Sequence, residues 1–230
     1  MTQVSPVVEE MLEQVQRLQD ASGAARTKML GKRLHVTLGT VTNNLSRLQR
    51  FGLVKRVRYG GTRLTGEGRN IALRVLRRHR LIERLLTDIL RVPWNKAHDA
   101  ACRLEHSIDD DVTDAIENVL GHPKTCPHGN PIPSKSGRIS TQDWVRLAEL
   151  STDDSGRVVR VLDEEEHGAL DHVASMNLVP GAKFRIKSHT PFDGSVVLDL
   201  GVSTVTVSKK TASLLAVTKR GQAETDDRRV

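Results

Sequence analysis

The chain has 230 residues, with 35 Lys and Arg against 28 Asp and Glu, and 37% of its residues are hydrophobic. This length is enough for one large domain or for two to three small ones, each with its own core. No apolar run approaches the roughly 18 residues that a membrane span needs, and acidic residues stand where a signal peptide would be apolar, so we expect a cytoplasmic protein. Two cysteines are too few for the disulfide framework of a secreted scaffold.

The positive charge is concentrated in one segment. Between Arg26 and Arg69 the chain carries eleven Lys and Arg residues and one acid, Glu67, whereas the rest of the chain is net negative. Such a surface suits a polyanion, because each neutralised phosphate releases counterions and adds affinity. Nucleic acid is therefore the leading partner. A solvated basic face without a ligand is the alternative that charge alone leaves open.

Apolar residues recur at helical spacing over 7–18, 25–34 and 37–51 and predict three helices. The last two, joined by a tight turn at 35–39, are predicted to form a helix-turn-helix. Thr37 is expected to cap the third helix. The exposed face of that helix would display side chains suited to base edges and phosphates, namely Thr40, Thr42, Asn43, Ser46 and Arg47.

A β-hairpin is predicted next. Residues 54–58 follow the alternating pattern of a β-strand. Residues 59–62, Tyr-Gly-Gly-Thr, are expected to form the hairpin turn, and 63–65 the return strand. Its basic residues would clamp phosphates beside the third helix, as the wing of a winged helix-turn-helix. Double-stranded DNA is thus the expected partner. The predicted DNA-binding residues are Arg26, Lys28, Thr37, Thr40, Thr42, Asn43, Ser46, Arg47, Arg50, Arg58 and Arg63.

The rest of the chain divides into a helical part and a β part. Helices are predicted over 69–90, 96–107 and 109–120, followed by a Pro- and Gly-rich stretch at 121–133 and a linker with a short helix at 142–150. Period-two alternation over 158–161, 183–187, 196–200, 204–208 and 216–218, with a helical patch at 165–176, predicts a small SH3-like β-barrel. The expected fold is mainly α with a small β part: a winged helix-turn-helix (1–72), a helical domain (73–140), the linker (141–150), the barrel (151–220) and a disordered tail (221–230).

Metal-binding side chains recur at helical spacing in the middle of the chain. His79 and Glu83 are four residues apart, and the next predicted helix carries His98, Cys102, Glu105 and His106. Imidazole, thiolate and carboxylate groups converging from packed helices suit a divalent transition metal. Glu10 and Glu13, on the polar face of the first helix, could join them. A single His at such spacing is more often a packing residue, but this many donors on two consecutive helices favour a metal site.

A cysteine enzyme is the competing interpretation of the same residues. Both histidines that could act as a base for Cys102 lie on its own helix, and no Gly-rich oxyanion loop is evident. We therefore do not expect an enzyme.

Three segments resemble a known family. They read Arg-His-Arg-Leu-Ile-Glu-Arg-Leu-Leu at 78–86, His-Asp-Ala-Ala-Cys-Arg-Leu-Glu-His at 98–106 and Gly-Asn-Pro-Ile-Pro at 129–133. Across essentially its whole length the chain resembles the diphtheria toxin repressor family of metal-dependent transcriptional regulators. The resemblance implies that the winged helix-turn-helix binds operator DNA and that the following helices form a homodimer. It also implies that metal holds the N-terminal domain in a DNA-competent orientation, with no membrane and no small-molecule substrate involved.

The resemblance also assigns metal ligands. It places His79, Glu83 and His98 in an ancillary site and Cys102, Glu105 and His106 in a primary site, to which the first helix adds Glu10 and Glu13. Glu10 stands where iron-type members have a thioether, Glu13 where manganese-type members use a carboxylate, and Cys102 where the latter usually have a carboxylate. We therefore expect Mn²⁺ first and Fe²⁺ next, with other divalent transition metals bound in vitro. Glu166 sits near a position from which the C-terminal domain can lend an ancillary ligand; a solvated acidic run is the alternative.

Two functions remain open at this point. One is a metal-sensing repressor, in which the cation relieves repulsion between carboxylates such as Glu10, Glu13 and Glu105 and so orders the dimer for DNA. The other is a constitutive winged-helix DNA-binding protein whose metal is purely structural. Only the first would lose DNA affinity reversibly when the metal is chelated.

Overall fold

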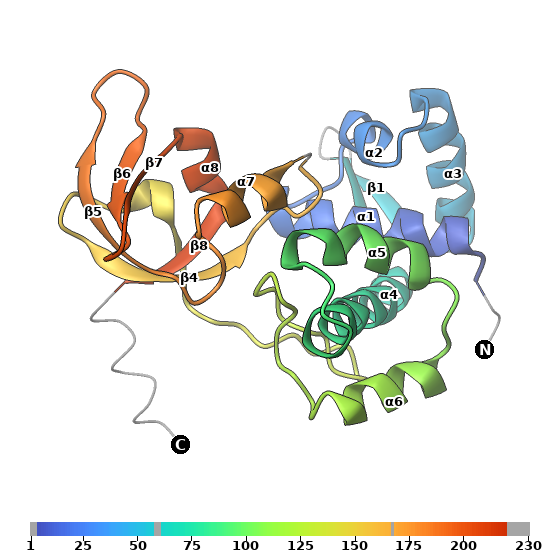
Figure 1. Cartoon of the computed structure of the whole chain (residues 1–230). Helices are drawn as coiled ribbons and strands as arrows, with labels where there is room; N and C mark the ends of the chain where they lie inside the picture. Colours follow the sequence, from blue (N-terminus) through green and yellow to red (C-terminus); the bar gives the residue numbers. More distant parts are fainter. Residues whose placement is uncertain (1–3, 58–60, 167, 220–230) are drawn as a thin grey trace. The chain divides into compact units, whose positions relative to one another are not determined.

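The computed structural model describes residues 4–57, 61–166 and 168–219 (Figure 1). The chain divides into two compact units. The first unit comprises Met1–Ile89, Asp99–Lys124 and Ile132–Ser140, and the second comprises Leu90–His98, Thr125–Pro131 and Thr141–Val230. In the described part of the chain, no helix combines the length and the apolar character needed to cross a bilayer.

The first unit begins with the predicted helix-turn-helix. Helix α1 spans Pro6–Ser22, α2 Thr27–Arg33 and α3 Leu38–Arg50. The side chains of Val41, Leu45 and Leu48 recur on one stripe of α3 and are buried in the core that α1 and α2 share. Thr37 caps α3, since its Oγ1 accepts a hydrogen bond from the backbone N–H of Thr40 at 3.2 Å.

The wing is a two-stranded antiparallel sheet of β1, Val54–Val57, and β2, Gly61–Leu64. It is joined to the α1–α2 connection, because Ala25 N–H donates to the Thr62 carbonyl and Thr62 N–H to that of Ala25, at 2.9 and 2.8 Å. Gly61 has φ +83°, and a Cβ there would lie 2.7 Å from the Ala25 carbonyl oxygen, so only glycine fits. Gln19 of α1 accepts a hydrogen bond from the N–H of Leu64. Part of the predicted hairpin turn, with Arg58, lies outside the described residues.

Three further helices follow along the chain. Helix α4 spans Gly66–Arg84, is capped by Thr65, and continues into a π-helical turn, η1, at Leu85–Ile89. A 3₁₀ turn, η2 at Trp94–Lys96, precedes α5, Ala97–Leu104, and α6 spans Asp110–Val119. The predicted helix at 96–107 is thus too long: α5 ends at Leu104, and Glu105 and His106 lie in the turn that follows. Helix α1 packs along α4.

The second unit is an antiparallel sheet of six strands in the order β3-β8-β4-β5-β6-β7. The strands are β3 Val145–Arg146, β4 Ser155–Val161, β5 Lys183–His189, β6 Val196–Asp199, β7 Thr204–Val207 and β8 Leu215–Lys219, with helices α7 at Ala169–Ser175 and α8 at Lys209–Leu214. Alternate strand residues such as Val158, Ile186, Leu198 and Val217 are buried in one core. This arrangement confirms the predicted SH3-like part of the fold.

The short helix predicted at 142–150 is present only in part. Val145 and Arg146 pair with β8, which makes them a strand, and Leu147–Glu149 form a single 3₁₀ turn, η3. The reason is tertiary: Leu147 is fully buried in the core of the second unit, and that packing overrides the local helical preference. Helix α8 was not predicted, and the predicted disordered tail lies outside the described residues.

Candidate metal centre

Two candidate ligands lie one turn apart on α4 and are completely buried. His79 Nε2 is 3.0 Å from Glu83 Oε1, and His79 Nδ1 is 2.6 Å from Glu105 Oε2. Burial alone would lower the pKa of His79, but the charges of Glu83 and Glu105 outweigh it and raise that pKa well above the usual value. The two carboxylates therefore favour the imidazolium form of His79.

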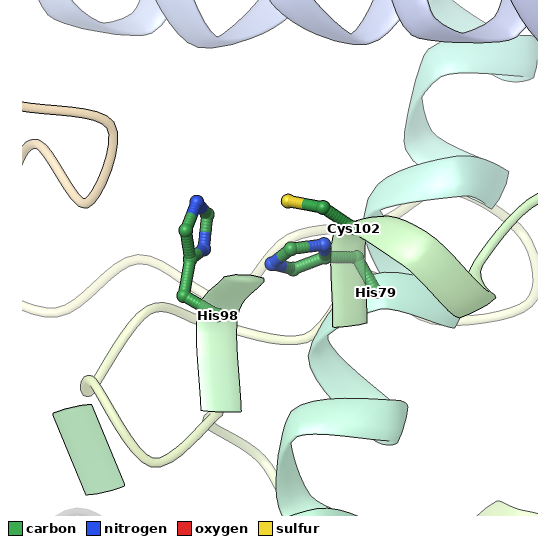
Figure 2. Close-up of side chains that lie close together, drawn as sticks. All are labelled: His79, His98 and Cys102. Atoms are coloured by element: carbon green, nitrogen blue, oxygen red, sulfur yellow. The ribbon is translucent and has the colours of Figure 1, made fainter. Parts of the chain in front are cut away.

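Helix α5 contributes His98 and Cys102, one turn apart. The division between the two units falls inside this helix, directly after His98, and the continuous helical backbone fixes His98 relative to Cys102. Figure 2 shows the two side chains with His79 of α4. A ligand atom of each lies within 4.8 Å of those of the other two, a spacing that a single cation can bridge.

Helix α1 places Glu13 against the same histidine. Glu13 is buried, its Oε1 lies 2.7 Å from Nη2 of Arg17, and with His79 and Glu105 it forms a second group of donors within 4.8 Å. Burial raises the pKa of Glu13 to about 7, and the nearby Glu105 adds to the shift, against the lowering effect of Arg17. A carboxylate whose charge is this unfavourable is one that a divalent cation would stabilise.

A third group consists of Glu10, Glu105 and His106. His106 Nε2 is 3.2 Å from Glu10 Oε2 and 3.5 Å from Glu105 Oε1, while Nδ1 is 2.9 Å from Glu9 Oε2. Hydrogen bonds with Glu10 and then Glu9 raise the pKa of His106 to about 10. A proton therefore sits where a cation would bind.

The three groups form one donor array, because His79 and Glu105 each belong to two of them. The array consists of Glu10, Glu13, His79, His98, Cys102, Glu105 and His106. It joins residues that the family resemblance divides between a primary and an ancillary site. Its buried carboxylates and imidazoles fit a divalent cation, which offsets their mutual repulsion.

Glu166 is not among these groups. Its Oε1 lies 2.7 Å from Nζ of Lys210, within the second unit. The neighbouring Glu164 is the buried acid, with Oε2 3.7 Å from His98 Nδ1. The predicted role of Glu166 stays a prediction, and Glu164 is the better-placed residue.

The second unit also holds donors that sequence reasoning left without a role. Glu164 Oε1 is 3.4 Å from His128 Nδ1 and 3.6 Å from Cys126 Sγ, and all three residues are buried. Asn130 donates to both Glu164 and the Val161 carbonyl. Cys-Pro-His at 126–128 was the available signal, but no periodicity connects it to an acid more than thirty residues later.

The predicted DNA-binding residues lie on an exposed surface of the first unit. Thr40, Thr42, Asn43, Ser46, Arg47 and Arg50 project from α3, Thr37 and Arg26 precede α3 and α2, Lys28 lies on α2, and Arg63 lies on β2. All of these are exposed, whereas Val41, Leu45 and Leu48 of α3 form the core stripe. The helix is thus anchored by one face and offers the other to a ligand.

Comparison with known proteins identifies the family. Residues 3–62 match the family model described as the N-terminal DNA-binding domain of iron-dependent repressors, 65–134 that of their metal-binding and dimerisation domain, and 145–219 the FeoA domain. The iron-dependent repressor IdeR of Mycobacterium tuberculosis is 34% identical over 201 residues, 83% of this chain and 87% of that protein. The diphtheria toxin repressor of Corynebacterium diphtheriae is 42% identical over 104 residues, 45% of this chain and 46% of that protein.

Solved structures agree. A manganese-dependent transcriptional repressor in complex with manganese superposes with a TM-score of 0.84 and 29% identity, covering 92% of this chain and 99% of that one. The crystal structure of IdeR from T. acidophilum superposes with a TM-score of 0.80 and 26% identity, covering 95% of this chain and 100% of that one. The chain therefore belongs to the iron-dependent repressor family, and it is a metal-dependent DNA-binding transcriptional regulator rather than an enzyme.

Proposed function

We propose that this protein is a cytoplasmic repressor of metal-ion homeostasis genes that binds operator DNA as a homodimer when Mn²⁺ occupies the donor array. The observation that supports the proposal most is the composition of the array across three elements. Glu10 and Glu13 come from α1, His79 from α4, and Glu105 and His106 from the turn after α5. Metal occupancy would therefore tie the first helix of the DNA-binding part to the helices behind it.

The donor types favour Mn²⁺. Two of the three groups contain only carboxylate and imidazole donors, which suit harder cations, and Glu105 is common to both. Cys102 enters only with His79 and His98, so a thiolate-rich site that selects Zn²⁺ is not formed. Fe²⁺ is the second candidate, because mixed nitrogen, oxygen and sulfur donors suit it. Bound metal supplies positive charge that replaces the protons now held on His79 and His106.

Helix α1 is the element through which metal and DNA would be coupled. Val8, Leu12 and Val15 on one face of α1 are buried in the core beneath α3, while Glu10 and Glu13 belong to the array. Metal binding to the array would therefore fix the position of α1 and, with it, that of α3. By linkage, the gain in DNA affinity caused by metal equals the gain in metal affinity caused by DNA.

A homodimer would form through the central helices. Ile89, Leu104, Val112 and Val119 are exposed apolar residues in the segment of η1, α5 and α6, and Val119 is 69% exposed. The family model that covers this segment is described as a dimerisation domain. A second copy of the chain is the occupant that this description favours, because exposed apolar groups of this kind mark interfaces.

The test is DNA binding under defined metal conditions. A duplex selected from a random pool by the Mn²⁺-loaded protein would be titrated at fixed salt with Mn²⁺, anaerobic Fe²⁺, Zn²⁺ or EDTA present. We expect Mn²⁺ to raise affinity by at least about tenfold, equivalent to 1.4 kcal/mol, and EDTA to reverse it. Circular dichroism of the EDTA-treated protein is the control for unfolding. DNA binding that ignores metal would instead support a constitutive regulator with a structural site.

A further inference from the structure

The two ring nitrogens of His106 face different partners. Nε2 lies 3.2 Å from Glu10 Oε2 and 3.5 Å from Glu105 Oε1, the two acids with which His106 forms a donor group. Nδ1 lies 2.9 Å from Glu9 Oε2, on the other side of the ring. One nitrogen thus points into the array and the other points to a carboxylate outside it.

Glu9 is held in place by a buried cation. Its second oxygen, Oε1, accepts a hydrogen bond from Arg78 Nη2 at 2.8 Å, and both side chains are nearly buried. Arg78 Nη1 in turn donates to the backbone carbonyls of Glu105 and Ile108, each at 3.2 Å. These contacts join α4 and the turn after α5 to the first turn of α1, and they fix both oxygens of Glu9.

We propose that Glu9 is the positioning residue of the metal centre: it accepts the Nδ1–H of His106 and so presents Nε2, unprotonated, as the ligand atom. Arg78 is the anchor that aims Glu9. The inference rests on the proposed function of the array. Histidine ligands commonly donate their second N–H to a carboxylate, which fixes the tautomer and raises the basicity of the ligating nitrogen.

Glu9 itself is not a donor to the array. The donor groups among the described residues include Glu10 but not its neighbour, because consecutive residues of a helix point about 100° apart. Both Glu9 oxygens already have partners in Arg78 and His106. Its role is therefore exerted through His106.

The experiment compares Glu9→Ala and Glu9→Gln with wild type and with Asp20→Ala, an exposed acid on the same helix. Mn²⁺ affinity would be measured by electron paramagnetic resonance, and the His106 ring by ¹⁵N NMR of the Cd²⁺-loaded protein. We expect Glu9→Ala to weaken Mn²⁺ binding by about 10- to 100-fold. Glu9→Gln should weaken it less, because an amide oxygen can still accept from Nδ1–H, and Asp20→Ala should have no effect.

The NMR measurement separates positioning from mere stabilisation. In wild type we expect Nε2 bound to Cd²⁺ and a slowly exchanging proton on Nδ1, and in Glu9→Ala rapid exchange of that proton. Wild-type affinity in Glu9→Ala, or Cd²⁺ bound at Nδ1, would overturn the inference. If Glu9→Ala does not fold, Glu9→Leu decides, because leucine fills the space but cannot accept the Nδ1–H of His106; unchanged affinity and exchange there would overturn the inference. His106→Ala, run in parallel, tests the array itself: if it retains full Mn²⁺ affinity, the proposed function fails first.

Discussion

The donor array and the exposed face of α3 place polar side chains in opposite surroundings. The donors are largely buried and lie against one another, with shifted pKa values at Glu13, His79 and His106. The side chains assigned to DNA are exposed along a helix whose other face is core. In the array each donor depends on its neighbours, so changes should be strongly non-additive. On α3 each side chain should act nearly alone.

The largest effect is expected from Glu105→Ala, because Glu105 belongs to two donor groups and accepts a hydrogen bond from His79. Removing it leaves His79 and Glu13 without a shared partner. We expect Mn²⁺ affinity to fall by more than about 100-fold, beyond the effect of a positioning residue, and metal-dependent DNA binding to be lost. Metal titration followed by fluorescence anisotropy of labelled DNA measures both. Retention of metal-dependent binding would show that the array is not one unit.

On α3, Asn43→Ala should give a local effect. Asn43 is exposed, and its amide is suited to a bidentate contact with adenine. We expect about 1–3 kcal/mol less discrimination at one base pair of the selected duplex and unchanged Mn²⁺ affinity. Arg47→Ala is the matched change at a residue that we expect to contact phosphate, and it should lower affinity for all sequences, with a shallower salt dependence. A change in metal affinity in either variant would contradict the separation of the two regions.

Thr37→Ala tests the start of α3. Loss of the hydrogen bond from Thr40 N–H to Thr37 Oγ1 should lower the free energy of unfolding by about 1 kcal/mol. Thr37→Ser keeps the acceptor and should restore most of it. Urea denaturation of the metal-free protein measures the difference. Equal stability of Thr37→Ala and wild type would mean that the cap contributes nothing.

The pH dependence of stability without metal tests the environment of His106. The pKa of His106 rises from 6.5 to about 10 on folding, so its contribution is full below pH 6.5 and is lost as the pH rises through about 10. Glu13 titrates near 7 and so contributes little between pH 8 and 10. The pKa of His79 is also raised, so His106→Asn is needed to separate the contribution of His106 from that of His79. We expect the Tm to fall across that range in wild type and to fall less in His106→Asn. Parallel curves for the two proteins would exclude this contribution.

Helices and strands with a regular hydrophobic period were predicted well from the sequence. Sites whose residues come together from distant segments were predicted only in part. Helix α3 was predicted because Val41, Leu45 and Leu48 repeat with the helical period and pack on one core. The helix predicted at 142–150 is shorter than expected, because pairing of Val145 with β8 depends on residues some seventy positions later. The turn that carries Glu105 and His106 was taken for helix. This short turn changes which donor side chains come together, and no pattern in the local sequence indicates it.

Donors were easier to predict than the residues that support them. His79, Glu83, His98 and Cys102 stood out because imidazole and thiolate side chains are rare and were evenly spaced. Glu9 did not, since an acid on a polar helix face has many explanations until Arg78 and His106 are seen beside it.

The hydrogen bonds between Ala25 and Thr62 form a β-bridge that ties the wing to the α1–α2 connection, so the wing is not a free hairpin. An isolated two-stranded hairpin is only marginally stable in water. Hydrogen bonds to Ala25 and to Gln19 of α1 hold the wing in a fixed position relative to that helix. A tilt of α1 would then move β1 and β2 with it. This attachment depends on Gly61, because a side chain there would force the wing and the α1–α2 connection apart.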